Sequence, residues 1–148
     1  SEMSGGIQDV RVEDITAINT QSAVRIKTAV GRGGYVKDIF AKGMTLSTMK
    51  YVFWMTGSYG SHPDPAFDPK ALPNITGINY RDVVATNVTY SAKLEGISNV
   101  NIQVSEQKMK LQWNCTDVAG VTSNVTPKTC QLLPEKGKFS CPFPNAVH

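Results

Sequence analysis

The sequence predicts an all-β chain wound as a parallel β-solenoid of about four coils, followed by a cysteine-containing tail. Three observations support this. Four segments share one apolar pattern, and the first three are each followed at a fixed distance by a second run rich in β-branched and aromatic residues. No window of more than about ten residues keeps the i, i+3, i+4, i+7 apolar spacing of an amphipathic helix.

The repeated segments begin at residues 7, 36, 75 and 97. Three of them, IQDVRVEDIT, VKDIFAKGMT and ITGINYRDVV, are apolar at positions 1, 4, 6 and 9, and the fourth, ISNVNIQVS, keeps positions 1, 4 and 6. The starts are 29, 39 and 22 residues apart. Such irregular spacing excludes a strict array and is typical of a coil with insertions.

The second run of each coil fixes a column of stacked side chains. Val24, Phe53 and Ala92 each lie 17 residues after the start of their segment, so in a parallel solenoid they stack on one another, facing inward. Their outward neighbours are Arg25, Trp54 and Lys93. An antiparallel sandwich is disfavoured because the sequence has no Asn-Gly or Asp-Gly hairpin signal.

We expect the interior to contain apolar residues from every coil. These are Val10, Ile15, Val24, Ile26, Ile39, Phe53, Ile78, Val83 and Val100. The strand edge of the N-terminal coil should be exposed or paired with a neighbouring chain, which would allow self-association.

Arg25 and Lys27 are two apart in a predicted strand, so they point to the same side, with Ile26 behind them. The simplest interpretation is a solvated strand face. The column Arg25, Trp54 and Lys93 also suits an anionic sugar polymer, because Arg and Lys bind carboxylates and an aromatic ring stacks on a sugar ring. Alternatively, Trp54 packs under the long loop 57–73.

Composition narrows the classes of function. The chain has 148 residues, 41% hydrophobic and 18% charged, with a net charge of +3. We find no block of like charges typical of a nucleic-acid arm, no apolar run near the ~18 residues of a membrane span, and no signal peptide in the sequence as given. No CxxC spacing occurs and only His62 and His148 are available, so we expect neither metal nor cofactor.

Cysteines and sequons favour a secretory route. Cys115, Cys130 and Cys141 all lie in the last 34 residues, which is typical of a disulfide-stapled tail, and their odd number leaves one thiol over. Four Asn-x-Ser/Thr sequons occur, at Asn74, Asn87, Asn114 and Asn124, the last being the weakest because Pro127 follows it. A secreted, extracellular glycoprotein is therefore expected.

Several longer strings resemble plant polygalacturonase-type enzymes of glycoside hydrolase family 28. They are the run of residues 1–40, the loop GSYGSHPDPAFDPKALP and the tail pattern W-x-C…C-x-L-L…C-x-F-P. The resemblance implies a right-handed parallel β-helix and inverting hydrolysis of pectic galacturonan. It assigns Arg25, Ile26 and Lys27 to the family's R-I-K motif, which holds a galacturonate carboxylate, and by spacing it places a cleft tyrosine at Tyr59.

The same resemblance suggests the disulfide. Cys130 and Cys141 enclose a short loop and match the family's last two tail cysteines, which implies that they pair and leave Cys115 free. The segment LEGISNVNIQVS is shorter than the family's version and lacks a cysteine expected near it.

The family's acid and base residues are missing from these 148 residues. They come from N-T-D and D-D motifs supported by a G-H-G motif, and none of the three occurs here. The chain therefore resembles the C-terminal third of such an enzyme, with β-helix coils over 1–105 and a capping tail over 106–148. We expect a substrate-binding segment of a polygalacturonase-like hydrolase that is inactive alone. The alternative is a stand-alone, non-catalytic carbohydrate-binding or defence-type β-helix protein.

Overall fold

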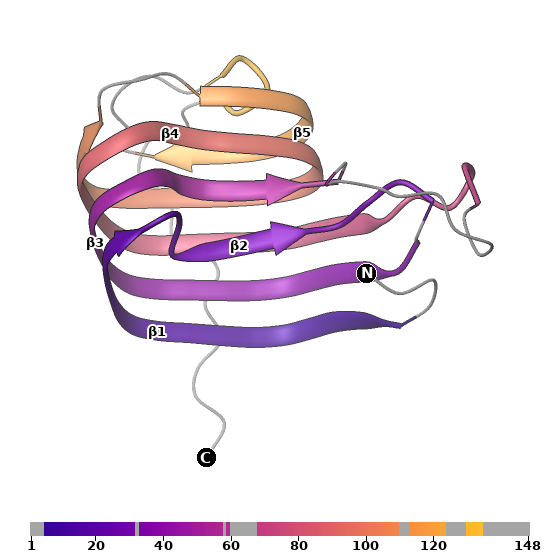
Figure 1. The fold of residues 1–148 in the computed structure, drawn as a ribbon, viewed down its shortest axis with the longest axis horizontal. Helices are drawn as coiled ribbons and strands as arrows, with labels where there is room; N and C mark the ends of the chain where they lie inside the picture. Colours follow the sequence, from indigo (N-terminus) through magenta and orange to yellow (C-terminus); the bar gives the residue numbers. More distant parts are fainter. Residues whose placement is uncertain are drawn as a thin grey trace.

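The structure, a computed structural model, describes residues 5–31, 33–57, 59, 68–109, 113–123 and 130–134. In this part of the chain all regular structure is β. The strands are β1 (Gly6–Thr20), β2 (Val24–Lys27), β3 (Tyr35–Thr56), β4 (Asn74–Met109) and β5 (Trp113–Ser123). They pair in parallel in the order β1-β3-β4-β5, and β2 also pairs with β3. Figure 1 shows stacked coils with β1 at one end and β5 at the other, the parallel β-helix that the sequence predicts.

The register between coils confirms the repeat. Ile7 pairs with Val36, and Val36 pairs with Ile75, which are the starts of the first three segments. The fourth segment begins 22 residues after the third, within the same strand, β4. There the side-chain amide of Asn101 donates a hydrogen bond to Oδ1 of Asn79, 22 residues earlier, at 2.8 Å. The coils therefore differ in length, while the first three repeated segments stay in register.

Left-handed residues bend each strand around the corners of the coil. In β1, Asp9, Asp14 and Asn19 have φ angles of 55°, 53° and 58°. The positions stacked on them also have positive φ: Asp38, Gly43 and Thr48 in β3, and Gly77, Asp82 and Asn87 in β4. Asp, Asn and Gly tolerate this conformation best, so the corners account for their recurrence every five residues.

Two of these corners place an aspartate against a glycine. A Cβ atom at Gly43 would lie 2.6 Å from Oδ1 of Asp14, and one at Gly77 would lie 2.9 Å from Oδ1 of Asp38. The carboxylate of one coil therefore occupies the space that a side chain on the next coil would need. These aspartates therefore have a structural role at the corners, where the backbone turns.

The interior forms largely as predicted. Ile26, Ile39, Phe53, Ile78 and Val83 are buried, and Val24 is partly buried against them. An aromatic group lies at the centre. The ring of Phe53 lies 4.7 Å from that of Tyr80, edge to face, and 5.6 Å from that of Trp113.

The N-terminal coil departs from the predicted interior. Val10 and Ile15 are 37% and 36% exposed, so their assignment to the buried core is wrong. Both lie on β1, which pairs only with β3 in the described residues, so no coil covers their other side. Ile7 and Ile18 of the same strand are also exposed. The side chain of Val100 lies outside the described residues.

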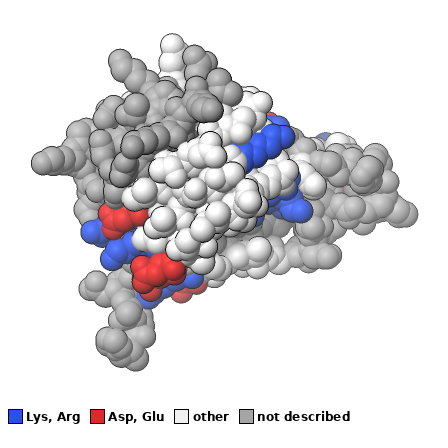
Figure 2. Space-filling view, turned by 60° about the vertical axis from the view of Figure 1, so that its left-hand side comes forward, with Lys and Arg blue, Asp and Glu red and all other residues white. Residues whose placement is uncertain are grey.

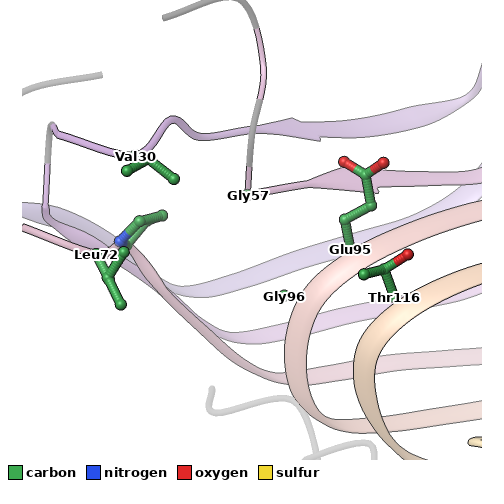
Figure 3. A pocket seen from close by; sticks show the side chains of 7 residues that line it. Val30, Gly57, Leu72, Glu95, Gly96 and Thr116 are labelled. Atoms are coloured by element: carbon green, nitrogen blue, oxygen red, sulfur yellow. The ribbon is translucent and has the colours of Figure 1, made fainter. Parts of the chain in front are cut away.

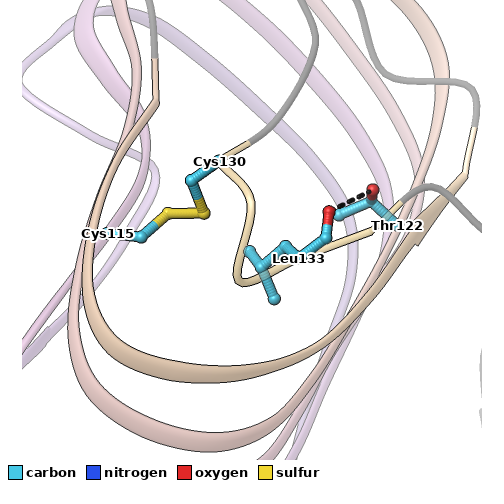
Figure 4. The surroundings of a disulfide bond; sticks show 4 residues. All are labelled: Cys115, Thr122, Cys130 and Leu133. Atoms are coloured by element: carbon cyan, nitrogen blue, oxygen red, sulfur yellow. Dashed lines mark hydrogen bonds between the residues drawn. A yellow bond between two sulfur atoms is a disulfide. The ribbon is translucent and has the colours of Figure 1, made fainter.

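A short tail segment closes the opposite end. Leu133 is fully buried, and its carbonyl accepts a hydrogen bond from the hydroxyl of Thr122 on β5 at 3.4 Å. The backbone N–H of Thr122 donates to the carbonyl of Pro134 at 3.1 Å. Figure 4 shows Leu133 turned towards the interior, next to a disulfide bond. This segment thus covers the apolar interior at the last coil.

The disulfide joins Cys115 to Cys130, with a Cα–Cα distance of 6.3 Å. The predicted pairing of Cys130 with Cys141, and the predicted free thiol at Cys115, are therefore corrected. Burial of Leu133 folds the segment 130–134 back over β5, and this brings Cys130 to Cys115. Cys141 lies outside the described residues. In the chain-entropy model, closing a loop of 15 residues contributes about 3 kcal/mol.

Parallel pairing continues beyond the last predicted coil. β4 runs to Met109, and β5 pairs with it from Trp113 to Ser123, with one irregularity between Ile97 and Val100. The expected division at residue 105 into coils and tail stays a prediction. Within the described residues, no helix is long and apolar enough to cross a membrane.

Figure 2 shows a face of the solenoid whose centre is uncharged in the described residues, with Lys, Arg, Asp and Glu at its margins.

Tyr80 makes stability sensitive to alkaline pH. Its side chain is fully buried, its hydroxyl has no hydrogen-bond partner among the described residues, and burial raises its pKa. The unfolded chain releases this proton near pH ~10, whereas the folded chain keeps it. The contribution of Tyr80 to the free energy of unfolding should therefore be fully present below about pH 10. Above that pH it should decrease, by at most about 1.4 kcal/mol per pH unit.

We expect Tyr80→Phe to lose less stability than the natural chain between about pH 9 and about pH 11, measured by urea unfolding. At neutral pH the variant should be equal in stability or higher by about 1 kcal/mol, because a buried unpaired hydroxyl is removed. Tyr90→Phe is the matched control, since Tyr90 is 36% exposed. An identical alkaline loss in the Tyr80→Phe chain would contradict this account.

Candidate functional site: a cation and aromatic face on one strand

Arg25 and Lys27 lie on the same face of β2, as predicted. Ile26, between them, is buried at 8% exposure, while Lys27 is exposed and Arg25 partly so. β2 pairs in parallel with the end of β3, where Arg25 is the partner of Trp54 and Lys27 of Thr56. Alternation along the strand therefore fixes the direction of both cations.

The guanidinium of Arg25 lies over the indole of Trp54. Its Cζ atom is 3.4 Å from the ring centroid, and its Nη1 donates a hydrogen bond to Oε1 of Gln21 at 3.0 Å. Among the described residues, its buried Nε has no hydrogen-bond partner. Cation–π contact of this kind is worth about 0.5–2 kcal/mol. Arg25 is thus held over the indole of Trp54.

Tyr59 completes the face. Its ring centroid is 4.9 Å from Cζ of Arg25 and 4.8 Å from Nζ of Lys27. Its backbone N–H donates to the carbonyl of Thr28, just after β2, at 2.8 Å. This bond ties Tyr59 to the end of the strand that carries both cations. The structure therefore brings together Arg25, Lys27 and Tyr59, although they come from two separate segments.

The outward column continues across the coils. Arg25 pairs with Trp54, Trp54 with Lys93, and Lys93 with Asn114; we call these four residues the Arg25 column. The predicted order of cation, indole and cation is confirmed. Trp54 lies partly buried under Arg25. Most of the loop that was the alternative cover for Trp54 lies outside the described residues.

Glu95, which no sequence pattern singled out, lies beside this column. Its Oε2 accepts a hydrogen bond from the hydroxyl of Thr56 at 2.7 Å, and its Oε1 lies 3.5 Å from Nζ of Lys93. Thr56 and Glu95 are 39 residues apart, the spacing between the second and third repeats. The spacing between these two repeats was therefore enough to predict that Thr56 and Glu95 lie side by side.

A pocket opens next to Glu95, at the ends of β2 and of the matching part of β3. Its volume is about 330 Å³. In Figure 3, Val30 and Leu72 stand on one side, Glu95 and Thr116 on the other, and Gly57 between them. We call it the Glu95 pocket. In the described residues, no three His, Cys, Asp or Glu side chains are grouped to hold a metal ion.

The predicted glycosylation sites are on the surface. Asn74, Asn87 and Asn114 are all exposed. Asn87 occupies a left-handed corner, and its amide donates to the hydroxyl of Thr48 at 3.0 Å. Asn124 lies outside the described residues. Exposure permits modification at the first three positions.

Removal of the Arg25 side chain should uncover Trp54. We expect Arg25→Ala to increase quenching of tryptophan fluorescence by acrylamide, because the guanidinium covers one face of the indole. It should also cost about 1 kcal/mol of unfolding free energy. The other tryptophan, Trp113, is 8% exposed and provides a constant background.

Lys27→Ala is the matched control for this measurement. Its Nζ contacts Tyr59 rather than Trp54, so quenching should match that of the natural chain. Equal quenching in all three proteins would show that Arg25 does not cover the indole in solution.

Comparison with known proteins identifies relatives over almost the whole chain. A sequence model of the family described as Glycosyl hydrolases family 28 matches residues 2–141. A probable polygalacturonase from Vitis vinifera is 59% identical over 157 aligned residues, covering 97% of this chain and 32% of the relative. Endopolygalacturonase I from Aspergillus aculeatus is 31% identical over 129, covering 86% of this chain and 31% of the relative.

A third relative, endopolygalacturonase B from Aspergillus niger, is 30% identical over 122 aligned residues, covering 78% of this chain. No solved structure matches the chain significantly. The chain spans about a third of the length of these relatives, at 32%, 31% and 32%.

Proposed function

The chain belongs to glycosyl hydrolases family 28, and from that membership we propose that Arg25, Lys27 and Tyr59 bind galacturonate units of a pectic chain. The observation that carries this proposal is the face itself. Two cations on one strand lie within 5 Å of the same tyrosine ring, at 4.9 and 4.8 Å. Such a face suits a ligand that offers carboxylates and sugar rings together.

Each group has a distinct task in this proposal. Arg25 is stacked on Trp54 by one face, so its N–H edge is available for a carboxylate in a planar, charge-assisted contact. Because the stack already restricts the guanidinium, less side-chain entropy is lost on binding. Lys27 adds a point charge, and Tyr59 offers an aromatic surface with a hydroxyl to the sugar ring.

We propose further that the chain acts as the substrate-positioning part of a longer polygalacturonase-type hydrolase. Inverting hydrolysis needs one carboxylic acid to protonate the leaving oxygen and one carboxylate to activate water. Of the described carboxylates, Glu95 is the one beside the Arg25 column, and it already bonds Thr56 and Lys93. Asp14 and Asp38 lie against glycines at corners. The acid and base would then come from elsewhere in the longer protein.

A binding experiment tests the proposed site. Oligogalacturonate should bind the chain weakly, and Arg25→Ala and Lys27→Ala should each lower its affinity about two- to fivefold, as for exposed charge pairs. Binding should weaken as salt is raised. Titration calorimetry measures the affinity, and a reducing-sugar assay on polygalacturonic acid should show no turnover.

Lys37→Ala is the matched control, because Lys37 also lies over a tyrosine ring, that of Tyr35, at 5.3 Å. Its affinity should equal that of the natural chain. Unchanged binding in the Arg25→Ala, Lys27→Ala double variant would show that these residues form an ordinary solvated face and do not bind the ligand. Steady turnover would show that a catalytic pair is present in the chain.

One alternative function has its own supporting observation. Because the N-T-D, D-D and G-H-G motifs are absent from the sequence, a non-catalytic carbohydrate-binding or defence-type β-helix protein explains the same face. It requires pectin contact without hydrolysis. The two functions differ in the size of the natural protein.

We also propose a secreted or cell-wall location and self-association. The exposed sequons at Asn74, Asn87 and Asn114 support glycosylation in a secretory route. The exposed apolar side chains of β1, Ile7 and Ile18 among them, support pairing of that edge with a second strand.

The native mass, measured before and after N-glycosidase treatment, separates these possibilities. A parent chain roughly three times heavier supports the hydrolase, as the 32% coverage of the Vitis vinifera relative implies. A denatured chain mass near 16.1 kDa supports the stand-alone alternative, and a native mass that is a multiple of the denatured mass supports self-association. A mass unchanged by the glycosidase would contradict glycosylation of the three asparagines.

A further inference from the structure

The Glu95 pocket differs in chemistry from the cationic face beside it. Its walls are formed by apolar side chains, those of Val30, Leu72 and Pro73. Its polar side chains are Glu95 and Thr116, and among the lining residues Glu95 is the ionisable one. A small apolar recess with a few fixed polar groups is typical of a ligand site.

The floor of the pocket is formed by backbone. A Cβ atom at Gly57 would lie 3.4 Å from the carbonyl oxygen of Glu95 and 3.9 Å from Cα of Gly96. The backbone N–H of Gly57 donates to that same carbonyl at 3.1 Å. The two glycines thus bring neighbouring coils together without side chains, which leaves the space above them open.

The pocket is continuous with the proposed galacturonate site. Lys27 is the register partner of Thr56, and the hydroxyl of Thr56 donates to Glu95 at 2.7 Å. Neighbouring strands are about 4.8 Å apart, so Glu95 lies two strands, or about 10 Å, from Lys27. A sugar chain held by Lys27 would therefore reach this pocket with a neighbouring unit.

We propose that the Glu95 pocket accepts an uncharged sugar unit and disfavours a free galacturonate. A second carboxylate would face that of Glu95 across a partly apolar space, where like charges repel more strongly than in water. Nζ of Lys93 lies 3.5 Å from Oε1 of Glu95, but Lys93 is not among the described residues that line the pocket, so it weakens this repulsion without placing a cation in the pocket wall. An uncharged ring places its C–H face against Val30 and Leu72, and its hydroxyls reach Glu95 and Thr116. This inference rests on the proposed function and adds a specificity to it.

Two sources supply such a unit: the methyl ester of galacturonate, and a plain hexose within the chain. Three oligomers of equal length separate them. In one every unit is free galacturonate, in the second galacturonate alternates with its methyl ester, and in the third it alternates with an uncharged hexose. All three keep carboxylates for Arg25 and Lys27.

The experiment compares Glu95→Gln with the natural chain by calorimetric titration of the three oligomers. Glutamine keeps a carbonyl oxygen for the Thr56 hydroxyl but removes the charge. We expect the affinity for the fully charged oligomer to rise about three- to fivefold, the range for partly exposed charges, and to rise less at high salt. Affinity for whichever alternating oligomer fits the pocket should stay within about twofold.

Glu13→Gln is the matched control, because it removes one exposed carboxylate from β1. It should change no affinity. Should Glu95→Gln not fold, Leu72→Asp serves instead, since Leu72 is 66% exposed at the rim. An added carboxylate there should lower affinity for the fully charged oligomer about three- to fivefold, and Leu72→Asn should not.

The outcomes separate this inference from the proposed function. Loss of affinity in Arg25→Ala combined with no effect of Glu95→Gln on any oligomer overturns the pocket and leaves the cationic face in place. A chain that binds none of the three oligomers overturns both. A gain confined to the fully charged oligomer supports the pocket. The alternating oligomer that binds more tightly then identifies the source.

Discussion

Parallel backbone pairing between successive coils determines where the side chains of this protein lie. Once Ile7 is fixed beside Val36, and Val36 beside Ile75, every later position of those coils is fixed too. The positions of the cationic face and of the aromatic core both follow from this single register. Arg25 lies over Trp54 because Val24 lies beside Phe53, one residue earlier. A shift of one residue would exchange inward and outward side chains along the whole strand.

The corners show how the same register limits the choice of residues. Each coil must bend at left-handed positions, and these are stacked from coil to coil. A glycine in one coil leaves room for the aspartate of the coil stacked on it, as in the contacts of Asp14 with Gly43 and Asp38 with Gly77. Several acidic residues of the chain therefore serve the geometry of the backbone at these corners. Their presence in a family of hydrolases is no sign of acid or base chemistry at those positions.

Much of this arrangement was predictable because a repeat can be recognised from the local pattern of residues alone. The starts of the coils, the inward column at Val24 and the direction of Arg25 and Lys27 all follow from period-two alternation and equal offsets. Features that depend on ends and on three-dimensional closure were not predictable in this way. Val10 and Ile15 match the inward pattern but lie on an uncovered coil. Cys130 pairs with Cys115 because Leu133 is buried at the last coil, a tertiary constraint that the spacing of cysteines does not encode.

Glu95 illustrates a further limit. As a single residue in a strand it matches no motif, and its hydrogen bond with Thr56, one coil earlier, connects two positions that are distant in the sequence. Pairwise contacts of this kind become visible when a coil period is applied to polar residues as well as apolar ones. The R-I-K segment was easier to find, because its alternation lies within four consecutive residues.

The two ends of the solenoid differ in a way that affects its dynamics. At β5 a disulfide and the buried Leu133 hold the last coil, whereas β1 presents Ile7, Val10, Ile15 and Ile18 to solvent. In a stack of coils, each coil is stabilised mainly by its neighbours, so opening begins where a neighbour is missing. In the 148-residue chain taken by itself, backbone amides of β1 should thus exchange their hydrogens fastest, with protection increasing coil by coil towards β5. Because β2 belongs to that first coil, fraying from this end reaches the strand that carries Arg25 and Lys27 first. The order of this face depends on how firmly the outermost coil is held.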